Sequence, residues 1–282
     1  MMLDVPPDWA ELMDRLALGS WRRVVVLGGT DVGKSSFCRL LCDLLASLGR
    51  RVALLDADLG QKMVGPPACV SLATFTSGAL DLLAIRFVGE ASAAANIPGV
   101  IAATARLAGS SSVDRLVVNT SGLITGPGIP LKRWKLDVLD ADHVVALARH
   151  DELAPVLHAL PPGRVHRLRP SPLARRKTAS LRERNRRASL LAALGDCRPL
   201  SLPDLLVEDL HRSPPWPETL RLCGLADATG EDRALGLVRW SDYLDRHEVW
   251  TGLPEFQPHR MRLGMTLADL GAVPGLFQPD QA

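Results

Sequence analysis

Apolar runs alternate with amphipathic stretches over the N-terminal two thirds of the chain. Short runs rich in valine, leucine and isoleucine are bounded by turn residues, which predicts buried strands. The expected strands cover residues 22–28, 51–56, 116–119, 143–147 and 164–168. Residues 8–18 and 34–48 instead predict helices, and further helical stretches are expected between the strands. Strands that alternate with helices predict an α/β fold, with a parallel sheet covered by helices on both faces.

The pattern changes near residue 198. Prolines punctuate the stretch that follows, and short extended runs come next, at residues 220–227, 234–240, 248–254 and 259–267. Such runs predict strands. We therefore expect an α/β domain over residues 1–198 and a small β-rich C-terminal domain over residues 199–282.

Composition narrows the class of protein. The chain has 282 residues and 47% of them are hydrophobic, enough apolar material for a real core, so wholesale disorder is excluded. No apolar run reaches the roughly eighteen residues that a membrane-spanning helix needs. The N-terminal segment carries acids and prolines where a secretory signal has a basic start and an apolar stretch. We expect a cytoplasmic protein with no membrane partner.

Cysteines and histidines lie outside any recognisable motif. The five cysteines form no C-x-x-C pair, and free cysteine is commonly buried. Cys38 and Cys42 are four residues apart, so they are interpreted as buried thiols on one helical face, with a metal site as the alternative. The histidines that could be considered as catalytic bases are interpreted as structural or surface residues; these are His143, His150 and His166.

The net charge of +2 conceals an uneven distribution. Residues 164–187 hold ten Lys or Arg and one acid, a local charge of +9, which leaves −7 for the remaining 23 basic and 30 acidic residues. A concentrated positive field indicates an anionic partner.

A glycine-rich loop follows the first expected strand and opens the helix at residue 34. It matches G-x-x-x-x-G-K-[ST], in the strand–loop–helix context that the motif requires. Glycines let the backbone wrap around phosphates, and the amides at the helix start attract the anion. Lys34 would reach the β- and γ-phosphates, and Ser35 would ligate Mg²⁺. The expected nucleotide-binding residues are Gly28, Gly29, Thr30, Asp31, Val32, Gly33, Lys34, Ser35 and Ser36.

Two carboxylates follow the next strand. Asp56 and Asp58 share one side of an extended chain, so one can hold Mg²⁺ or its water while the other accepts a proton from an attacking hydroxyl. The alternative is a pair of ordinary acids at a strand end. Because no asparagine starts the N-K-x-D motif of GTPases, ATP is the expected nucleotide.

Three segments resemble the polynucleotide 5′-hydroxyl kinases of RNA processing, whose members act in pre-mRNA 3′-end processing, tRNA splicing and ribosomal RNA maturation. The first segment is the loop at 28–36, with Thr-Asp-Val inside it. The second is Asp-Ala-Asp-Leu-Gly-Gln at 56–61, followed by Val-Gly-Pro-Pro at 64–67. The third, Asn-Thr-Ser-Gly-Leu at 119–123, resembles the family's clasp motif. The resemblance covers about residues 22–195 and is weaker beyond them.

The resemblance implies transfer of the ATP γ-phosphoryl group to the 5′-OH of RNA, with DNA as a second candidate acceptor. Lys34 would stabilise the transferring group, and Asp58 would orient and deprotonate the hydroxyl. Gln61 would order the metal or the hydroxyl. The implied metal residues are Ser35, Asp56, Asp58 and Gln61, and the implied clasp residues, which would hold the acceptor's first nucleotides, are Thr120, Ser121 and Gly122.

The arginine-rich stretch would form a lid, at about residues 171–195. Negative charge spreads over the transferring oxygens in the transition state, and arginine is well suited to stabilise it. If 172–194 is a helix, Arg175, Arg182 and Arg186 lie near one stripe. The leading catalytic candidate is Arg182, followed by Arg176 and Arg186. The alternative is a solvated basic helix.

The chain also departs from the family. Leu123 stands where relatives often carry tryptophan, so base stacking there is lost; Trp134 could replace it or simply pack. The family's N-terminal β domain is missing from this sequence, and Lys177 stands where the first arginine of the lid pair is expected. Two other functions stay open: an ATP-bound scaffold subunit of an RNA-processing complex, and a small-molecule kinase on the same fold.

Overall fold

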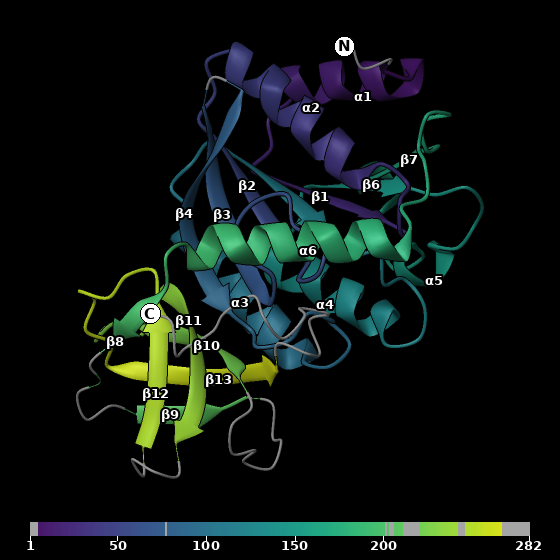
Figure 1. The fold of residues 1–282 in the computed structure, drawn as a ribbon. Helices are drawn as coiled ribbons and strands as arrows, with labels where there is room; N and C mark the ends of the chain where they lie inside the picture. The colour runs from purple at the N-terminus through teal and green to yellow at the C-terminus, as the bar shows by residue number, and fades with distance from the viewer. Residues whose placement is uncertain are drawn as a thin grey trace. The chain divides into compact units, whose positions relative to one another are not determined.

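A computed structural model describes residues 5–76, 78–200, 202, 206–210, 220–241 and 246–266 (Figure 1). The chain divides into two compact units. The first unit comprises residues 1–58, 70–83 and 97–177, and the second comprises 59–69, 84–96 and 178–282. Among the described residues, no helix is long and apolar enough to cross a membrane.

The first unit is built on a mostly parallel sheet, as the sequence predicts. Its strands follow the order β7-β6-β1-β5-β2-β3-β4. The parallel strands are β1 (Arg23–Gly28), β2 (Val52–Ala57), β5 (Arg115–Thr120), β6 (His143–Leu147) and β7 (Val165–Leu168). Their central residues are almost fully buried, which is why they appear in the sequence as continuous apolar runs.

Between residues 56 and 116, the expectation of helical structure is confirmed by α3 (Ile97–Ser110) and is wrong for residues 69–87. Two strands come first, β3 (Cys69–Thr76) and β4 (Ala79–Phe87), and β3 pairs antiparallel with β2. Both strands also extend into the second unit at one end. The stretch mixes Val, Thr, Ile and Phe, which favour strands, with Leu and Ala, which favour helices, so pairing with β2 decides its structure.

Helices cover both faces of the parallel strands, as predicted (Figure 1). In the figure, α1 (Pro7–Leu18) and α2 (Lys34–Ser47) lie on one side, and α3 (Ile97–Ser110) and α4 (Gly128–Leu139) on the other. Short turns follow at α5 (Ala154–Leu157) and η1 (Pro162–Arg164). Helix α2 buries Phe37, Leu41 and Leu45 against the sheet, which accounts for its amphipathic spacing.

The second unit is β-rich, and the four C-terminal runs predicted as strands are confirmed. They form β10 (Arg221–Ala226), β11 (Asp232–Ser241), β12 (Arg246–Thr251) and β13 (Arg260–Thr266). Two further strands are β8 (Arg198–Leu200), which pairs with β12, and β9 (Leu206–Asp209), which runs parallel to β13. The C-terminal part of β4 pairs with β11.

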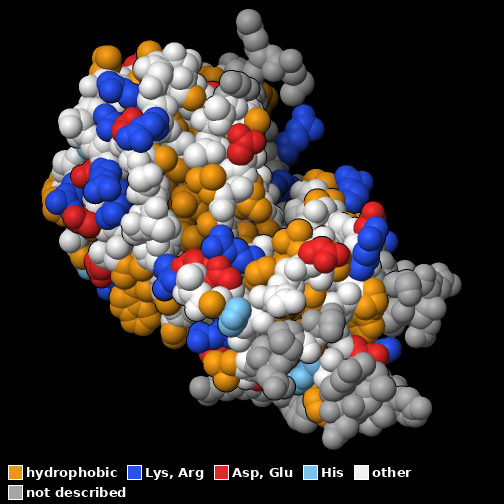
Figure 2. Space-filling model, turned by 90° about the vertical axis from the view of Figure 1, so that its left-hand side faces the viewer, with side chains coloured by type: hydrophobic (Ala, Val, Ile, Leu, Met, Phe, Trp, Pro, Cys, Tyr) orange, Lys and Arg blue, Asp and Glu red, His pale blue; other side chains and the backbone are white. Residues whose placement is uncertain are grey.

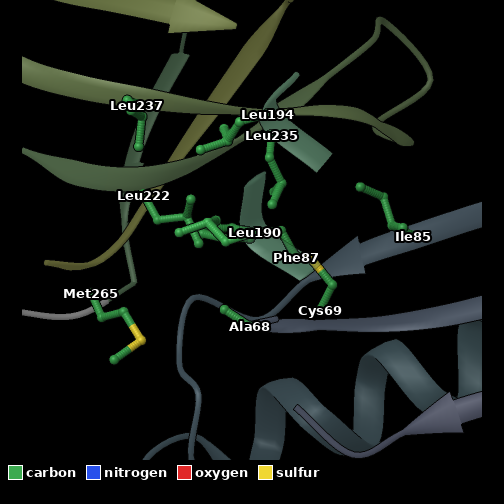
Figure 3. Packing of buried hydrophobic residues seen from close by; sticks show 10 residues of the cluster. All are labelled: Ala68, Cys69, Ile85, Phe87, Leu190, Leu194, Leu222, Leu235, Leu237 and Met265. Carbon is green, nitrogen blue, oxygen red and sulfur yellow. The ribbon is translucent and has the colours of Figure 1, made fainter. Parts of the chain in front are cut away.

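The helix of the arginine-rich stretch, α6 (Ala179–Leu194), belongs to the second unit. Its Leu190 and Leu194 lie in a buried cluster with Phe87, Leu222 and Leu235 (Figure 3). The second unit therefore includes α6, whereas the domain border expected from the sequence lies after it, at residue 198. Burial of these leucines, which no local pattern reveals, joins the helix to the β-rich unit.

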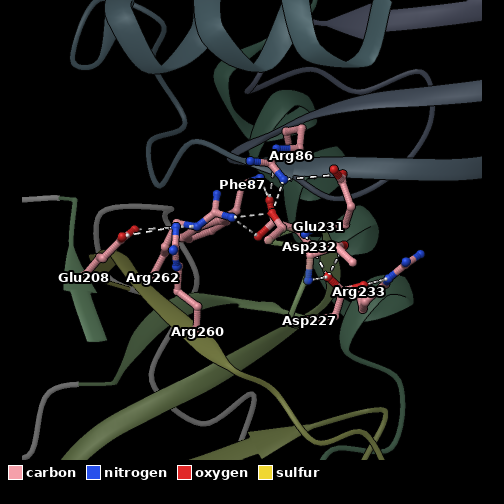
Figure 4. A network of polar contacts seen from close by, with 11 residues as sticks. Arg86, Phe87, Glu208, Asp227, Glu231, Asp232, Arg233, Arg260 and Arg262 are labelled. Atoms are coloured by element: carbon pink, nitrogen blue, oxygen red, sulfur yellow. Dashed lines mark hydrogen bonds and ion pairs between the residues drawn. The ribbon is translucent and has the colours of Figure 1, made fainter. Parts of the chain in front are cut away.

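A polar network ties residues 84–96 to the same unit (Figure 4). The buried Asp232 carboxylate accepts the backbone N–H of Phe87 at 2.9 Å and pairs with Arg262 at 3.0 Å and Arg86 at 3.6 Å. Arg262 also lies 3.9 Å from Glu208. Burial raises the pKa of Asp232, and the two guanidinium groups offset part of this effect, so the contacts of one carboxylate join these strands to one another.

Apolar side chains are not confined to the cores. Figure 2 shows hydrophobic side chains gathered over part of one face, with charged groups beside them. Large hydrophobic residues that are exposed include Leu82 and Leu83 on β4 and Trp134 and Val138 on α4.

Candidate functional site

The glycine-rich loop joins the end of β1 to the start of α2 in the first unit. Gly33 has φ 97°, and a Cβ atom there would lie 2.8 Å from the ring of Trp9. Trp9 is buried and packs edge-to-face on Phe37, with ring centroids 5.4 Å apart. The loop therefore needs glycine at position 33 for both conformation and space.

Lys34 begins α2 and is buried. Its ammonium group curls back over the loop and donates to the Gly29 carbonyl at 2.6 Å. Burial lowers the pKa of Lys34, while the carboxylate of Asp58 acts in the opposite direction. Lys34 begins α2 and Asp58 follows β2, so both residues that the sequence predicted for phosphoryl transfer lie in the first unit.

Asp56 and Asn119 form a buried pair at the ends of neighbouring strands β2 and β5, where they are directly opposite in register. One carboxylate oxygen of Asp56 accepts from the Asn119 amide at 3.0 Å and from the Asp58 backbone N–H at 3.3 Å. Asn119 Oδ1 is buried and has no hydrogen-bond partner among the described residues. The sequence interpretation gave Asn119 no role, although polar residues at adjacent strand ends were a usable signal.

The predicted clasp residues follow β5 and lie against the glycine-rich loop. Thr120 is buried and donates through Oγ1 to the Val26 carbonyl at 2.8 Å. A Cβ atom at Gly122 would lie 2.4 Å from Thr30 Oγ1 and 2.8 Å from the Thr30 backbone N and Cα atoms. Gly122 therefore permits a backbone approach between two loops that a side chain would prevent.

Two buried lysines of α4 reach the same region, and the sequence interpretation missed both. The Lys132 ammonium donates to the Ser121 carbonyl at 2.5 Å, and the Lys135 ammonium donates to the Ala57 carbonyl at 3.0 Å. Burial places the pKa of Lys132 well below its ordinary value, with the neighbouring charge of Lys135 adding to the effect. Lysine on the apolar stripe of a helix was the available signal.

The metal ligands expected at the site are oxygen donors from two segments of the chain, the loop at 28–36 and the segment 56–61. Within the described residues, no three His, Cys, Asp or Glu side chains cluster into a metal cage. Magnesium at nucleotide sites rarely has such a cage, because it keeps waters and takes one or two carboxylates with the phosphates. Ser35, Asp56 and Asp58 offer that donor set, and the unpartnered oxygen of Asn119 fits a hydrated metal ion beside Asp56.

Gln61 and the helical arginines lie in the second unit. The Gln61 amide donates to the Gly60 carbonyl at 2.9 Å and to the Arg182 carbonyl at 3.2 Å. The predicted helix 172–194 was too long, because α6 begins only after Thr178, whose Oγ1 accepts from the Leu181 N–H. The expected stripe therefore keeps Arg182 and Arg186 and loses Arg175.

Arg176 lies in the first unit, in the segment that leads to α6. Next to it, the Lys177 N–H donates to the Asp31 carboxylate at 2.9 Å. The start of the arginine-rich stretch is thereby fixed to the glycine-rich loop within that unit.

The remaining predictions concern cysteine and histidine. All five cysteines are free thiols; Cys38 and Cys42 are buried as expected, and Cys69 and Cys223 are buried as well. Burial raises the pKa of Cys42 to about 12, so this thiol is protonated and inert at neutral pH. His143 and His166, on neighbouring strands, bond to each other through ring nitrogens 3.1 Å apart.

Comparison with known proteins gives a consistent result. A family model described as mRNA cleavage and polyadenylation factor CLP1 P-loop matches residues 28–192. The polyribonucleotide 5′-hydroxyl-kinase PF0112 of Pyrococcus furiosus is 36% identical over 162 residues, which cover 55% of this chain and 46% of that protein. The polyribonucleotide 5′-hydroxyl-kinase MJ1315 of Methanocaldococcus jannaschii is 34% identical over 142 residues, covering 48% and 39%. The chain thus spans about half the length of the curated relatives that it matches.

Solved structures extend the likeness to the fold of both units. The structure of the wild-type Clp1p–Pcf11p complex matches with a TM-score of 0.71 and 13% identity, covering 90% of this chain and 76% of the matched chain. At this identity the match concerns the fold alone.

Proposed function

The chain belongs to the CLP1 P-loop family, and from this premise we propose that it is an ATP-dependent polynucleotide 5′-hydroxyl kinase. It transfers the γ-phosphoryl group of ATP to the 5′-OH of RNA, with DNA as a second candidate acceptor. The observation that carries the proposal is the convergence, in one unit, of Lys34, Asp58 and the loop at 120–122. The names of the relatives support the same reaction.

The glycine-rich loop and Lys34 bind the triphosphate. Backbone amides of residues 29–36 surround the phosphates, and the Lys34 ammonium, which the Gly29 carbonyl now holds over the loop, contacts the β- and γ-phosphates. Ser35 and the carboxylates of Asp56 and Asp58 would hold Mg²⁺, which would neutralise phosphate charge. Asn119 fixes the orientation of Asp56 for that purpose.

Asp58 acts on the acceptor. Its carboxylate accepts a hydrogen bond from the 5′-OH and takes the proton as the oxygen attacks the γ-phosphorus, while the bond from the γ-phosphorus to the β–γ bridging oxygen breaks and ADP leaves. Thr120, Ser121 and Gly122 bind the first nucleotides, and Leu123 gives apolar contact in place of an aromatic stack. Gln61 is proposed to order the metal or the hydroxyl.

An arginine of the stretch at 171–195 stabilises the transferring phosphoryl group, with Arg182 first and Arg176 and Arg186 next. Such an arginine contributes about 10³- to 10⁵-fold to the rate in phosphoryl transfer. Substitution of each arginine by alanine, with kcat as the readout, ranks the candidates. A cytoplasmic location without a membrane partner is part of the same proposal.

Label transfer tests the reaction. With Mg²⁺ and γ-labelled ATP, the protein should label a 5′-OH oligonucleotide, and an oligonucleotide that already carries a 5′-phosphate should stay unlabelled. Lys34→Ala and Asp58→Ala should each abolish labelling, because one removes the phosphate contact and the other the base. Absence of labelling on every RNA and DNA oligonucleotide offered would refute the proposal.

A scaffold is the second candidate, because the matched solved structure is a complex of Clp1p with Pcf11p. In that case ATP is part of the folded structure. Tight retention of ATP through purification, with no turnover in the presence of any 5′-OH oligonucleotide, would favour this function over the kinase.

A further inference from the structure

Helix α4 carries two lysines where an apolar residue is expected. The helix faces the sheet with a stripe at i, i+3, i+4, i+7, i+8 and i+11, and lysine occupies two of these positions. Lys132 and Lys135 are both fully buried. Burial of an ammonium group costs free energy unless the group is hydrogen-bonded. A buried lysine therefore indicates a hydrogen-bonding role that leucine could not fill.

Both amines reach the ends of neighbouring parallel strands. The Lys132 ammonium lies 2.5 Å from the Ser121 carbonyl oxygen and 3.3 Å from Ser121 Oγ. The Lys135 ammonium lies 3.0 Å from the Ala57 carbonyl oxygen. Ala57 and Thr120 are opposite in register, so the two lysines hold adjacent points of one sheet edge. The residues that follow these points are Asp58 and Gly122.

Contacts continue from Lys132 to the glycine-rich loop. Ser121 precedes Gly122, whose backbone lies so close to Thr30 that a Cβ atom would come within 2.4 Å of the threonine hydroxyl. On the other side of the contact, a Cβ atom at Gly29 would lie 3.4 Å from Ile124 Cδ1. The loop at 121–124 is therefore packed on the phosphate-binding loop, and Lys132 is the charged group that bonds to its first residue.

The charges of the site act on the same lysine. Lys34 and Asp58 both lie near enough to influence the protonation of Lys132, as does Lys135. The two amines of α4 bond to Ser121 and Ala57, so they lie beside the segments that carry Gly122 and Asp58.

We propose that Lys132 is a positioning residue, which holds the loop at 121–124 against Thr30 and thereby aligns the acceptor's 5′ end with the triphosphate. Lys135 holds Ala57 and so fixes the direction of Asp58. The proposal rests on the kinase function proposed above, and it concerns residues that have no contact with the reacting atoms themselves.

Substitution of Lys132 by methionine separates positioning from folding. Methionine matches the length of lysine, and apolar replacement of buried charge often leaves stability unchanged or higher. We expect Lys132→Met to keep the thermal midpoint at or above that of the wild type. We expect kcat/KM for a 5′-OH oligonucleotide to fall about 10- to 100-fold, mostly through kcat, because misplacement by ~1 Å costs about that much. The dissociation constant of ATP should change far less.

Arg133→Met is the matched control, because it removes a charge from the next residue of the helix. The Arg133 guanidinium donates to the Pro155 carbonyl at 2.5 Å and so acts away from the loop. Its kcat/KM should stay near that of the wild type. The proposal is overturned if kcat/KM is unchanged in Lys132→Met. It is also overturned if the loss of kcat/KM is accompanied by a lower thermal midpoint that accounts for it, because the lysine would then act only on folding.

Amide hydrogen exchange tests the positioning role of Lys132 separately from the kinase function. If the wild type labels no oligonucleotide, the kinase function fails, and the amides of residues 121–124 still report on the loop. Faster exchange of these amides in Lys132→Met, with unchanged exchange in Arg133→Met, supports the holding role of Lys132. Equal exchange in both variants overturns it.

Discussion

At the scale of single residues, the site depends on two glycines that stand where a side chain would clash with a neighbouring residue. Gly122 lets the loop after β5 meet Thr30 backbone to backbone, and Gly33 leaves room for the ring of Trp9. Neither requirement can be read from the glycines alone, because each arises from a residue that is distant in sequence. The spaces that these glycines leave determine the shape of the phosphate-binding loop.

Gly122→Ala should weaken nucleotide binding. The new methyl group would displace Thr30 from the loop that binds the phosphates, so we expect the dissociation constant of ATP to rise at least tenfold, equivalent to about 1.4 kcal/mol. Isothermal titration calorimetry measures this directly.

Gly109→Ala is the control for Gly122→Ala. An added Cβ at Gly109 meets nothing within 4 Å, and the residue lies in α3. Alanine is favoured over glycine in a helix by up to about 1 kcal/mol, so this variant should be slightly more stable and bind ATP normally. Equal ATP affinities in the two variants would contradict the assignment of Gly122.

At the scale of elements, α6 shows how packing assigns a helix to a unit. Four arginines precede Leu190 along the helix: Arg182, Arg184, Arg186 and Arg187. Leu190 and Leu194, near its end, are buried with Phe87 and the strands of the second unit, so charge and packing are divided along the length of one helix.

Leu190→Ala should destabilise the second unit by about 2–5 kcal/mol, because it leaves a cavity in the cluster of Figure 3. Urea unfolding followed by circular dichroism measures the free energy of unfolding. Leu191→Ala, one residue along and half exposed, should change it by no more than about 0.5 kcal/mol. Similar losses in both variants would show that α6 does not pack as described.

Strands β6 and β7 carry a pH-dependent contact. Burial lowers the pKa of His143 and of His166, and for His166 the neighbouring His143 adds to the effect. The folded state therefore binds fewer protons than the unfolded state, whose histidines titrate near pH 6.5. Stability from this pair is present above about pH 6.5 and is lost as the pH falls.

The thermal midpoint should accordingly decrease as the pH is lowered from about 7.5 to about 5.5, a range that spans the ordinary histidine pKa. A His143→Gln/His166→Gln variant should show a shallower fall, and His150→Gln, which is exposed, should follow the wild type. The same pH dependence in all three proteins would exclude the histidine pair as its cause.

At the scale of the whole molecule, the uneven distribution of charge bears on which partner the protein binds. Residues 164–187 carry +9 in a chain whose net charge is +2. When such a segment binds a nucleic acid, its cationic side chains neutralise phosphates and displace the counterions of the nucleic acid. The affinity of the protein for the nucleic acid therefore depends steeply on salt concentration.

Binding of single-stranded RNA should weaken linearly on a plot of log affinity against log salt concentration. Arg187→Ala, which removes an exposed charge of the basic segment, should reduce the slope by about 0.7 if that arginine contacts a phosphate. Arg50→Ala removes an exposed charge elsewhere and should leave the slope unchanged. Fluorescence anisotropy at several salt concentrations measures both. Identical slopes would place the RNA away from Arg187.

Much of the fold could be predicted from the sequence because its signals are local. Each buried parallel strand is a continuous apolar run, and the glycine-rich loop has its spacing between a strand and a helix. The β-rich C-terminal unit follows from short extended runs in the same way. The roles proposed for Lys34 and Asp58 also come from local signals, because each residue stands at a fixed position in a motif.

Tertiary structure alone decided what depends on partners far along the chain. Helix α6 joins the β-rich unit because Leu190 packs in the core of that unit, with Phe87 and Leu222. Asn119 and Lys132 gain their roles only when strand ends and a helix converge, since burial and a bonding partner give a polar side chain its function. Sequence therefore determined the elements and the chemical groups, and packing determined which of those groups meet.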